Sequence, residues 1–137
     1  MYYNEVKMAT SYRHAEASAR KFGGQPEDYL KIHEFIDSSK KAFGDVRHRA
    51  LYHNTVGPWL CQEVFGPVIE ITTTSGKVKK IAVREIAESH IIEDLGCIPE
   101  VGDWLNCMDC KAWMGGKKTS VLSKGILLDE TIKEGNK

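Results

Sequence analysis

Residues 68–83, with the sequence VIEITTTSGKVKKIAV, decide the fold class of this 137-residue chain. Val68–Thr74 and Lys77–Val83 are rich in β-branched residues and partly alternate between apolar and polar positions, which is typical of half-buried strands. Ser75 and Gly76 between them are common turn residues. The stretch therefore predicts a β-hairpin.

The segments on both sides of this hairpin predict helices. Downstream, Arg84–Leu95 has apolar residues three and four positions apart and is followed by Gly96, a residue that commonly terminates helices. The upstream segment also has helical spacing, with a kink or break expected near Gly57–Pro58 because proline interrupts a helix. Helices are expected at 10–22, 26–43 and 45–66, and one last short helix at 101–105.

These elements predict an α+β fold that is mainly helical: three helices, a β-hairpin and then a fourth helix in a single domain. Met8 opens the phrase MATSYRHAEA, so residues 1–7 are interpreted as an N-terminal extension and 8–114 as the globular domain. Residues 115–137 are rich in Gly, Lys, Ser and Thr, which favours a loosely attached tail.

Charge and hydropathy argue against several classes of partner. Lysine plus arginine equals aspartate plus glutamate, 19 against 19, so the net charge does not indicate nucleic-acid binding. No apolar run has the length that a membrane-spanning helix needs, and the N-terminus lacks the apolar core of a signal peptide. We therefore expect a cytoplasmic protein with no membrane partner and with reduced cysteines.

Two His-x-x-x-Asp pairs are the strongest chemical signal in the chain. His33 and Asp37 are one helical turn apart, and His90 and Asp94 repeat this spacing on a different predicted helix. If the two helices face each other, the pairs can bind one divalent ion, such as zinc, manganese or iron, through nitrogen and oxygen ligands. The expected metal ligands are His33, Asp37, His48, His90 and Asp94.

The segment between these pairs carries two further histidines. His48 and His53 are five positions apart, about 140° around a regular helix, so they cannot both point at one site unless the helix is irregular. We assign His48 to the metal and His53 to ligand binding. His14, next to Arg13 in a polar helix, is interpreted as a surface residue.

Acidic and arginine residues beside the histidines complete the predicted site. Glu34 and Glu93 are candidate catalytic bases for a metal-activated water. Arg47 and Arg49 are candidates for binding a phosphate or carboxylate group. This residue set suits a metal-dependent phosphoester hydrolase, and it suits equally a pocket for a small anionic molecule.

Two other interpretations remain open. Cys107 and Cys110 form a CxxC motif that could be half a zinc site, completed by Cys97 and His90 at an unusual spacing, or a redox pair. Alternatively, the histidines form a buried hydrogen-bond network with a purely structural role.

The phrases SYRHAEASARKFGG, DYLKIHEFIDSSKKAFGDVRHRALYH and VREIAESHIIEDLGCIPEVGDWL resemble a family of short bacterial and phage proteins, domain of unknown function 6915, over residues 8–105. The resemblance implies a small self-contained domain, often carried by phages or prophages, and no known reaction. The family pattern excludes the cysteines and includes the positions of His33, Asp37, Arg47, His48, Arg49, His53, His90, Asp94 and Gly96.

The sequence therefore favours a small phage or bacterial domain that binds a divalent metal, with phosphoester hydrolysis as the reaction if it is an enzyme. The alternative is a non-enzymatic phage accessory protein that binds a host protein or an anionic small molecule. The two differ in whether the arginines and histidines serve a metal-bound substrate or contact a ligand directly.

Overall fold

A computed structural model describes residues 2–115 of the chain, with the backbone alone for residues 2–10. The chain divides into two compact units, Met1–Gly102 and Asp103–Lys137. The elements discussed below belong to the first unit, except that the helix Val101–Leu105 crosses the boundary and Ala112–Met114 lies in the second unit. The predicted tail lies outside the described residues, except for Gly115.

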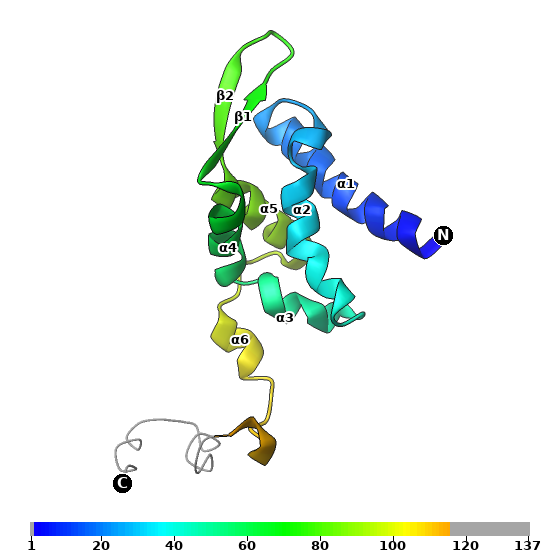
Figure 1. Cartoon of the computed structure of the whole chain (residues 1–137), viewed down its shortest axis with the longest axis vertical. Helices are drawn as coiled ribbons and strands as arrows, with labels where there is room; N and C mark the ends of the chain where they lie inside the picture. Colours follow the sequence, from blue (N-terminus) through cyan, green and yellow to red (C-terminus); the bar gives the residue numbers. More distant parts are fainter. Residues whose placement is uncertain (1, 116–137) are drawn as a thin grey trace. The chain divides into compact units, whose positions relative to one another are not determined.

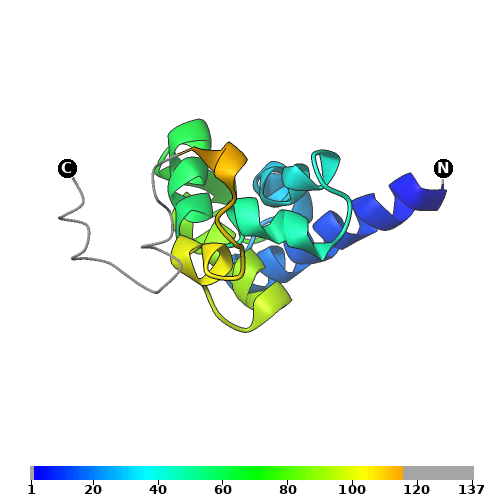
Figure 2. The same ribbon diagram turned by 90° about the horizontal axis from the view of Figure 1, so that it is seen from below.

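The described part of the chain is mainly helical with one antiparallel hairpin, which confirms the α+β prediction. Helices α1, α2, α4 and α5 pack side by side in the first unit (Figure 1), and Figure 2 shows the same helices from below. The α-helices are α1 (Tyr2–Phe22), α2 (Leu30–Asp37), α3 (Arg49–Tyr52), α4 (Val56–Phe65), α5 (Val83–Leu95) and α6 (Val101–Leu105), and short 3-10 helices occur at Pro26–Asp28, Ser38–Lys41, Val46–His48 and, in the second unit, Ala112–Met114.

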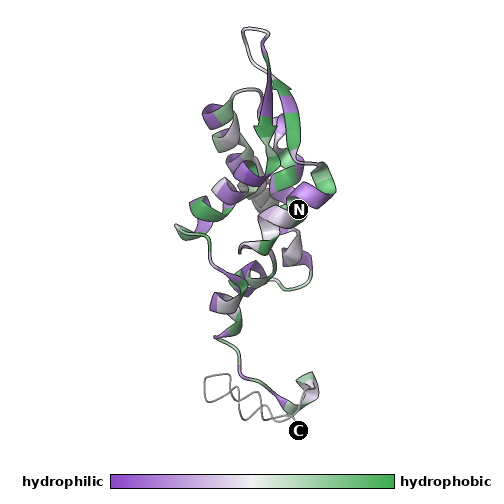
Figure 3. Ribbon diagram, turned by 90° about the vertical axis from the view of Figure 1, so that its left-hand side faces the viewer, coloured by the Kyte–Doolittle hydropathy of each residue, from purple (hydrophilic) through white to green (hydrophobic). Residues whose placement is uncertain are grey.

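The hairpin forms where the sequence predicts it. Strands β1 (Val68–Thr72) and β2 (Val78–Ala82) pair with Ile69 opposite Ile81. Gly76 has a φ of 88°, which favours glycine, and its N–H donates to the carbonyl of Thr73 to close the turn. Figure 3 shows hydrophobic and hydrophilic residues mixed on both strands, as expected for a ribbon with one face against the helices.

The first helix is longer than predicted. Its backbone is helical from Tyr2. Residues 2–7, which the sequence predicts to be part of an N-terminal extension, are therefore its first turns. It ends at Phe22, where Gly23 and Gly24 both have positive φ and Gly24 lies close to the side chain of Ile71. The double glycine therefore brings the end of α1 against β1.

Helices α2 and α5 each bury both apolar and polar residues. On α2, Ile32 and Ile36 belong to the hydrophobic core, and the residue after each, His33 or Asp37, is also buried. On α5, Ile86 and Ala87 are in the core while His90 is buried one turn later. The core and the buried polar residues thus share the same two helices.

The predicted long helix at 45–66 is divided, and its break lies at His53–Thr55 rather than at Gly57–Pro58. Pro58 lies in the first turn of α4, where an N–H has no helical acceptor and its absence costs little. Asn54 stabilises the break: its side-chain amide donates to the carbonyl of Ala50, and its Oδ1 accepts from the N–H of Val56.

Replacing Gly57 with alanine is expected to lower the free energy of unfolding by about 1–3 kcal/mol, because a Cβ at this position would overlap the carbonyl oxygen of Tyr52. The same change in an ordinary helix stabilises by up to about 1 kcal/mol. Urea denaturation measures the difference, with Gly44→Ala as the control because Gly44 faces open space. Equal stability of the two variants would mean that α4 does not approach α3 this closely.

Candidate metal centre

All five histidines of the chain are buried together in the first unit. They come from separate elements: α1, α2, the 3-10 helix before α3, the residue after α3, and α5. Their rings contact one another: His90 stacks on His14 with 3.8 Å between the centroids and lies edge-on to His53 at 5.1 Å. The helix packing therefore builds a cluster of imidazoles beside the hydrophobic core.

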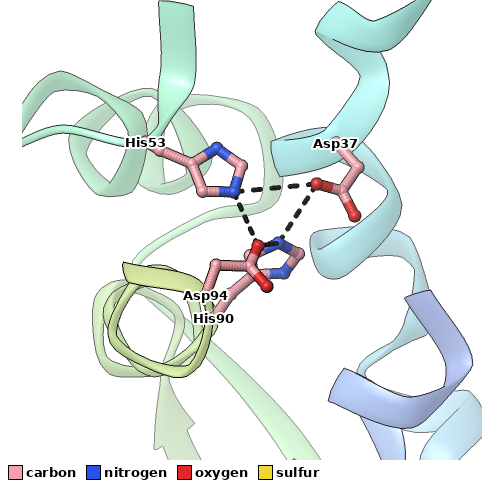
Figure 4. Close-up of side chains that lie close together, drawn as sticks. All are labelled: Asp37, His53, His90 and Asp94. Atoms are coloured by element: carbon pink, nitrogen blue, oxygen red, sulfur yellow. Dashed lines mark hydrogen bonds and ion pairs between the residues drawn. The ribbon is translucent and has the colours of Figure 1, made fainter. Parts of the chain in front are cut away.

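Two of these histidines and two neighbouring aspartates form a four-residue group that could hold a metal ion: Asp37, His53, His90 and Asp94. One ligand atom from each lies within 4.8 Å of the others. Figure 4 shows Asp37 and His53 turned toward His90 and Asp94 from different elements.

The distances suit a compact coordination site. The Nε2 atom of His53 lies 2.9 Å from Asp94 Oδ2 and 3.7 Å from Asp37 Oδ1. The Nε2 atom of His90 lies 3.2 Å from Asp37 Oδ1 and 3.3 Å from Asp94 Oδ2. Ligands at about 2.0–2.1 Å around a tetrahedral zinc ion are about 3.3 Å apart, so a small contraction or expansion would fit these atoms to an ion.

Of the two predicted His-x-x-x-Asp pairs, one contributes both members and the other contributes one. His90 and Asp94 both belong to the group, on one face of α5. From α2 only Asp37 belongs to it. His33 instead contacts Ser18 Oγ through Nε2 at 2.8 Å and His90 Nδ1 through its own Nδ1 at 2.9 Å.

His48 and His53 are both buried. A regular helix would not allow this, but the helix is interrupted after α3, at His53. His53 has φ −87° and ψ 64°, outside the helical region, and this turns its ring into the four-residue group. His48 lies outside the group, edge-on to His53 at 5.7 Å, with its Nδ1 2.8 Å from Ser39 Oγ. The sequence predicts that His48 coordinates the metal and that His53 contacts a bound small molecule. In the structure it is His53 that lies with the other candidate metal-coordinating residues.

The interpretation of His14 as a surface residue is wrong, because its side chain is buried against α5. Its Nδ1 lies 2.6 Å from Glu93 Oε1 and its Nε2 lies 3.2 Å from Asp94 Oδ1. A sequence signal for this burial exists, since small residues flank His14 at helical spacing and mark a face where another helix can approach closely. These buried neighbours on α1 are Ser11, Ala15 and Ser18.

The histidines keep both aspartates of the group ionised. Burial alone would raise the pKa of Asp94, but hydrogen bonds from His14, His53 and His90 hold it well below its usual range. Burial likewise opposes ionisation of Asp37, and the hydrogen bond from His90 lowers its pKa overall. The second oxygen of Asp37, Oδ2, is buried and has no hydrogen-bond partner among the described residues. A buried carboxylate oxygen of this kind fits a cation better than it fits an apolar interior.

The two candidate arginines differ sharply. Arg47 is exposed, pairs with Asp45 at 2.8 Å and lies over the ring of Phe43, so it does not contribute to the cluster. Arg49 lies beside the group, with Nη2 4.0 Å from Asp94 Oδ2. Its Nε is buried and has no hydrogen-bond partner in the described part of the chain.

The two candidate bases also differ. Glu34 is exposed on α2, so the structure does not support it as a base at this site. Glu93 is also exposed, but it is held by His14, whose other nitrogen contacts Asp94. Glu93 is therefore connected to the metal-binding group through one imidazole.

The cysteine zinc site that the sequence leaves open would share His90 with this cluster. Both nitrogens of His90 already contact His33, Asp37 and Asp94, so the structure does not support His90 as a ligand of that site. Cys97, Cys107 and Cys110 are exposed thiols. Burial raises the pKa of the remaining cysteine, Cys61, to about 12, so it stays a thiol.

Acidification from about pH 6.5 to 4 is expected to destabilise the metal-free protein. Burial, with neighbouring positive charges, lowers the pKa of His33 to about 2, and burial is also the main cause that lowers that of His48 to about 4. The unfolded chain therefore binds more protons than the folded chain in this range. As the pH is lowered, the free energy of unfolding decreases by up to about 1.4 kcal/mol per pH unit for each histidine. Against the effect of burial, the carboxylate partners of His14 raise its pKa, so protonated His14 stabilises the fold below pH 6.5. This stabilisation is lost as the pH rises above that value, so it does not change between pH 6.5 and 4.

Urea denaturation at pH 7, 6, 5 and 4 with a chelator present checks this dependence. A His48→Asn variant, which keeps a polar group beside Ser39, is expected to show a shallower slope. A free energy of unfolding that is constant or rises on acidification would show that these rings are not buried in their neutral form.

Comparison with known proteins identifies a family but no function. A family model described as a domain of unknown function, DUF6915, matches residues 9–114. No curated protein and no solved structure matches the chain. No helix among the described residues is long and apolar enough to cross a membrane.

Proposed function

The chain belongs to the family of domain of unknown function 6915, and we propose that it binds one divalent metal ion through Asp37, His53, His90 and Asp94. The observation that carries the proposal is the convergence of two imidazole nitrogens and two ionised carboxylates at one buried point. The oxygen of Asp37 that faces His53 and His90 is Oδ1, and its Oδ2 is buried without a hydrogen-bond partner among the described residues.

The identity of the ion decides what the site can do. Two nitrogen and two oxygen ligands suit zinc, manganese and iron. A four-coordinate zinc ion would be enclosed by the four side chains, as in structural sites, whereas a six-coordinate manganese or iron ion would have two positions left for water or substrate. Turnover with manganese or iron and none with zinc would follow from this difference.

For a catalytic role, the reaction that the residues support best is phosphoester hydrolysis. The bound ion would supply a water of lowered pKa and a Lewis acid for a phosphoryl oxygen. Arg49, which lies 4.0 Å from Asp94 through Nη2 and whose buried Nε has no partner in the described residues, would donate to a second phosphate oxygen. Glu93, through His14, holds Asp94 and is the remaining candidate for accepting a proton.

The proposed hydrolysis can be tested with bis(4-nitrophenyl) phosphate and with nucleotides as substrates. Each substrate is assayed separately with zinc, manganese and iron(II). We expect turnover that a chelator abolishes and that Arg49→Gln reduces by about 10-fold or more, given the strength of hydrogen bonds between charged groups. Arg47→Gln is the matched control, because Arg47 is exposed and pairs with Asp45. Metal binding without turnover of any of these substrates would contradict the catalytic role and leave the metal site.

A second candidate function is binding of a small anionic molecule without catalysis. Arg49 carries this alternative, since its partnerless Nε beside the site would be satisfied by a carboxylate or phosphate. A thermal-shift screen of nucleotides and inorganic phosphate, repeated with Arg49→Gln, would detect it. No shift with any anion would contradict it.

A further inference from the structure

A line of three buried side chains leads from α1 to the candidate metal ligand His90. Ser18 Oγ lies 2.8 Å from His33 Nε2, and His33 Nδ1 lies 2.9 Å from His90 Nδ1. His33 and His90 have no exposed surface and Ser18 is 1% exposed. Water therefore cannot replace these contacts, and each nitrogen must be satisfied by its neighbour.

The contact between two Nδ1 atoms restricts where the protons lie. A hydrogen bond between two imidazole nitrogens needs one N–H and one bare nitrogen. In the metal-free protein the Nε2 of His90 faces the ionised carboxylate of Asp37, which can only accept, so this nitrogen carries a proton. A metal ion bound at Nε2 would displace that proton to solvent. A neutral His90 then has its single proton on Nδ1, transferred from His33 Nδ1, and His33 takes up one proton from solvent at Nε2, so the number of protons on the two rings is unchanged.

The proton position on His90 determines the proton positions on His33 and Ser18. When His90 donates from Nδ1, the Nδ1 of His33 must be bare in order to accept. The single proton of a neutral His33 then lies on Nε2, which donates to the hydroxyl oxygen of Ser18. A charged His33 would donate from both nitrogens and could not accept from His90, so this arrangement requires the neutral ring.

We infer that His33 and Ser18 are positioning residues for the metal ligand His90: they fix its ring orientation and accept the Nδ1 proton of the tautomer that binds an ion through Nε2. Partners on the second nitrogen of a metal-binding histidine commonly have this role. The inference rests on the proposed metal site and extends it to two residues that do not touch the ion. It also accounts for why His33 is buried in the cluster although it lies outside the four-residue group.

The direct readout is the tautomer of His33 in the zinc-loaded protein. Long-range ¹H–¹⁵N correlation spectra of ¹⁵N-labelled protein distinguish a ring protonated at Nδ1 from one protonated at Nε2, and a His33→Asn variant assigns the signal. We expect His33 to be protonated at Nε2 and His90 at Nδ1 when zinc is bound. His33 protonated at Nδ1 in that state would overturn the inference, and this measurement on the wild-type sequence does not depend on the folding of any variant.

Zinc affinity provides the second readout, measured by competition with a chromogenic chelator in a Cys107→Ser/Cys110→Ser background so that the thiol pair of the CxxC motif does not contribute. His33→Leu is expected to weaken zinc binding by about 10–100-fold. His33→Asn, which retains a polar atom near the place of Nδ1, is expected to recover most of this loss, and Ser18→Ala is expected to weaken binding less than His33→Leu does.

Ser39→Ala is the matched control, because Ser39 holds His48 in the same way that Ser18 holds His33, but His48 lies outside the four-residue group. We expect its zinc affinity to equal that of the background protein. Equal affinity in His33→Leu and the background would overturn the positioning role while leaving the metal site in place. Absence of zinc binding in the background protein would instead contradict the proposed function itself.

Discussion

Replacing Asp94 with asparagine is expected to lower the free energy of unfolding of the metal-free protein by about 3–5 kcal/mol. The carboxylate of Asp94 contacts three histidines, at 2.9 Å from His53 Nε2, 3.2 Å from His14 Nε2 and 3.3 Å from His90 Nε2. An asparagine has one acceptor oxygen instead of two, and its amide directs N–H groups at rings that also donate. The change therefore leaves buried polar groups of α1 and α5 unsatisfied.

Urea denaturation at pH 7 in the presence of a chelator measures this loss. Glu85→Gln is the control, because it makes the same chemical change on an exposed position of α5. We expect the control to remain within about 0.5 kcal/mol of the parent protein. A similarly small effect of Asp94→Asn would mean that Asp94 is not the point at which the histidines meet.

Zinc is expected to raise the melting temperature of the protein by about 15 °C or more. Free zinc at about a thousandfold above its dissociation constant stabilises the folded state by about 4 kcal/mol if the unfolded chain does not bind it. In a domain of this size, each kcal/mol raises the melting temperature by several degrees, about 4–8 °C for 60–100 residues. Differential scanning calorimetry before and after addition of a chelator checks both the rise and its reversal.

The variant for comparison is Asp37→Asn/His53→Asn, which removes one ligand atom from each of two elements. Both proteins carry Cys107→Ser/Cys110→Ser, so that zinc bound by the thiol pair of the CxxC motif does not raise the melting temperature. The variant is expected to gain little from zinc. An equal rise in both proteins would assign the zinc effect to another place on the chain.

Local patterns in the sequence were sufficient for the fold class and for part of the site. The alternation at 68–83 predicted the hairpin and Gly96 the end of α5, and the structure confirms both. The spacing of His90 and Asp94 placed them on one face, and both belong to the four-residue group. Each of these features depends on residues that are close to each other in the chain, which is why it can be predicted from the sequence.

The rest of the site depends on packing between distant elements. The break at His53–Thr55 arises from the side-chain hydrogen bonds of Asn54, and it turns His53 inward in place of His48. His14 contacts Glu93, which is 79 positions away, so its burial became evident only when α1 was packed against α5. A periodicity argument treats each helix alone and cannot supply either contact.

The number of zinc ions retained per chain tests the central claim most directly. Elemental analysis would be made on untagged Cys107→Ser/Cys110→Ser protein, loaded with zinc and dialysed, beside the same protein carrying Asp37→Asn/His53→Asn. We predict one zinc ion per chain in the first protein and close to none in the second. Retention of no zinc by the first protein, or of equal amounts by both, would contradict a metal site formed by Asp37, His53, His90 and Asp94.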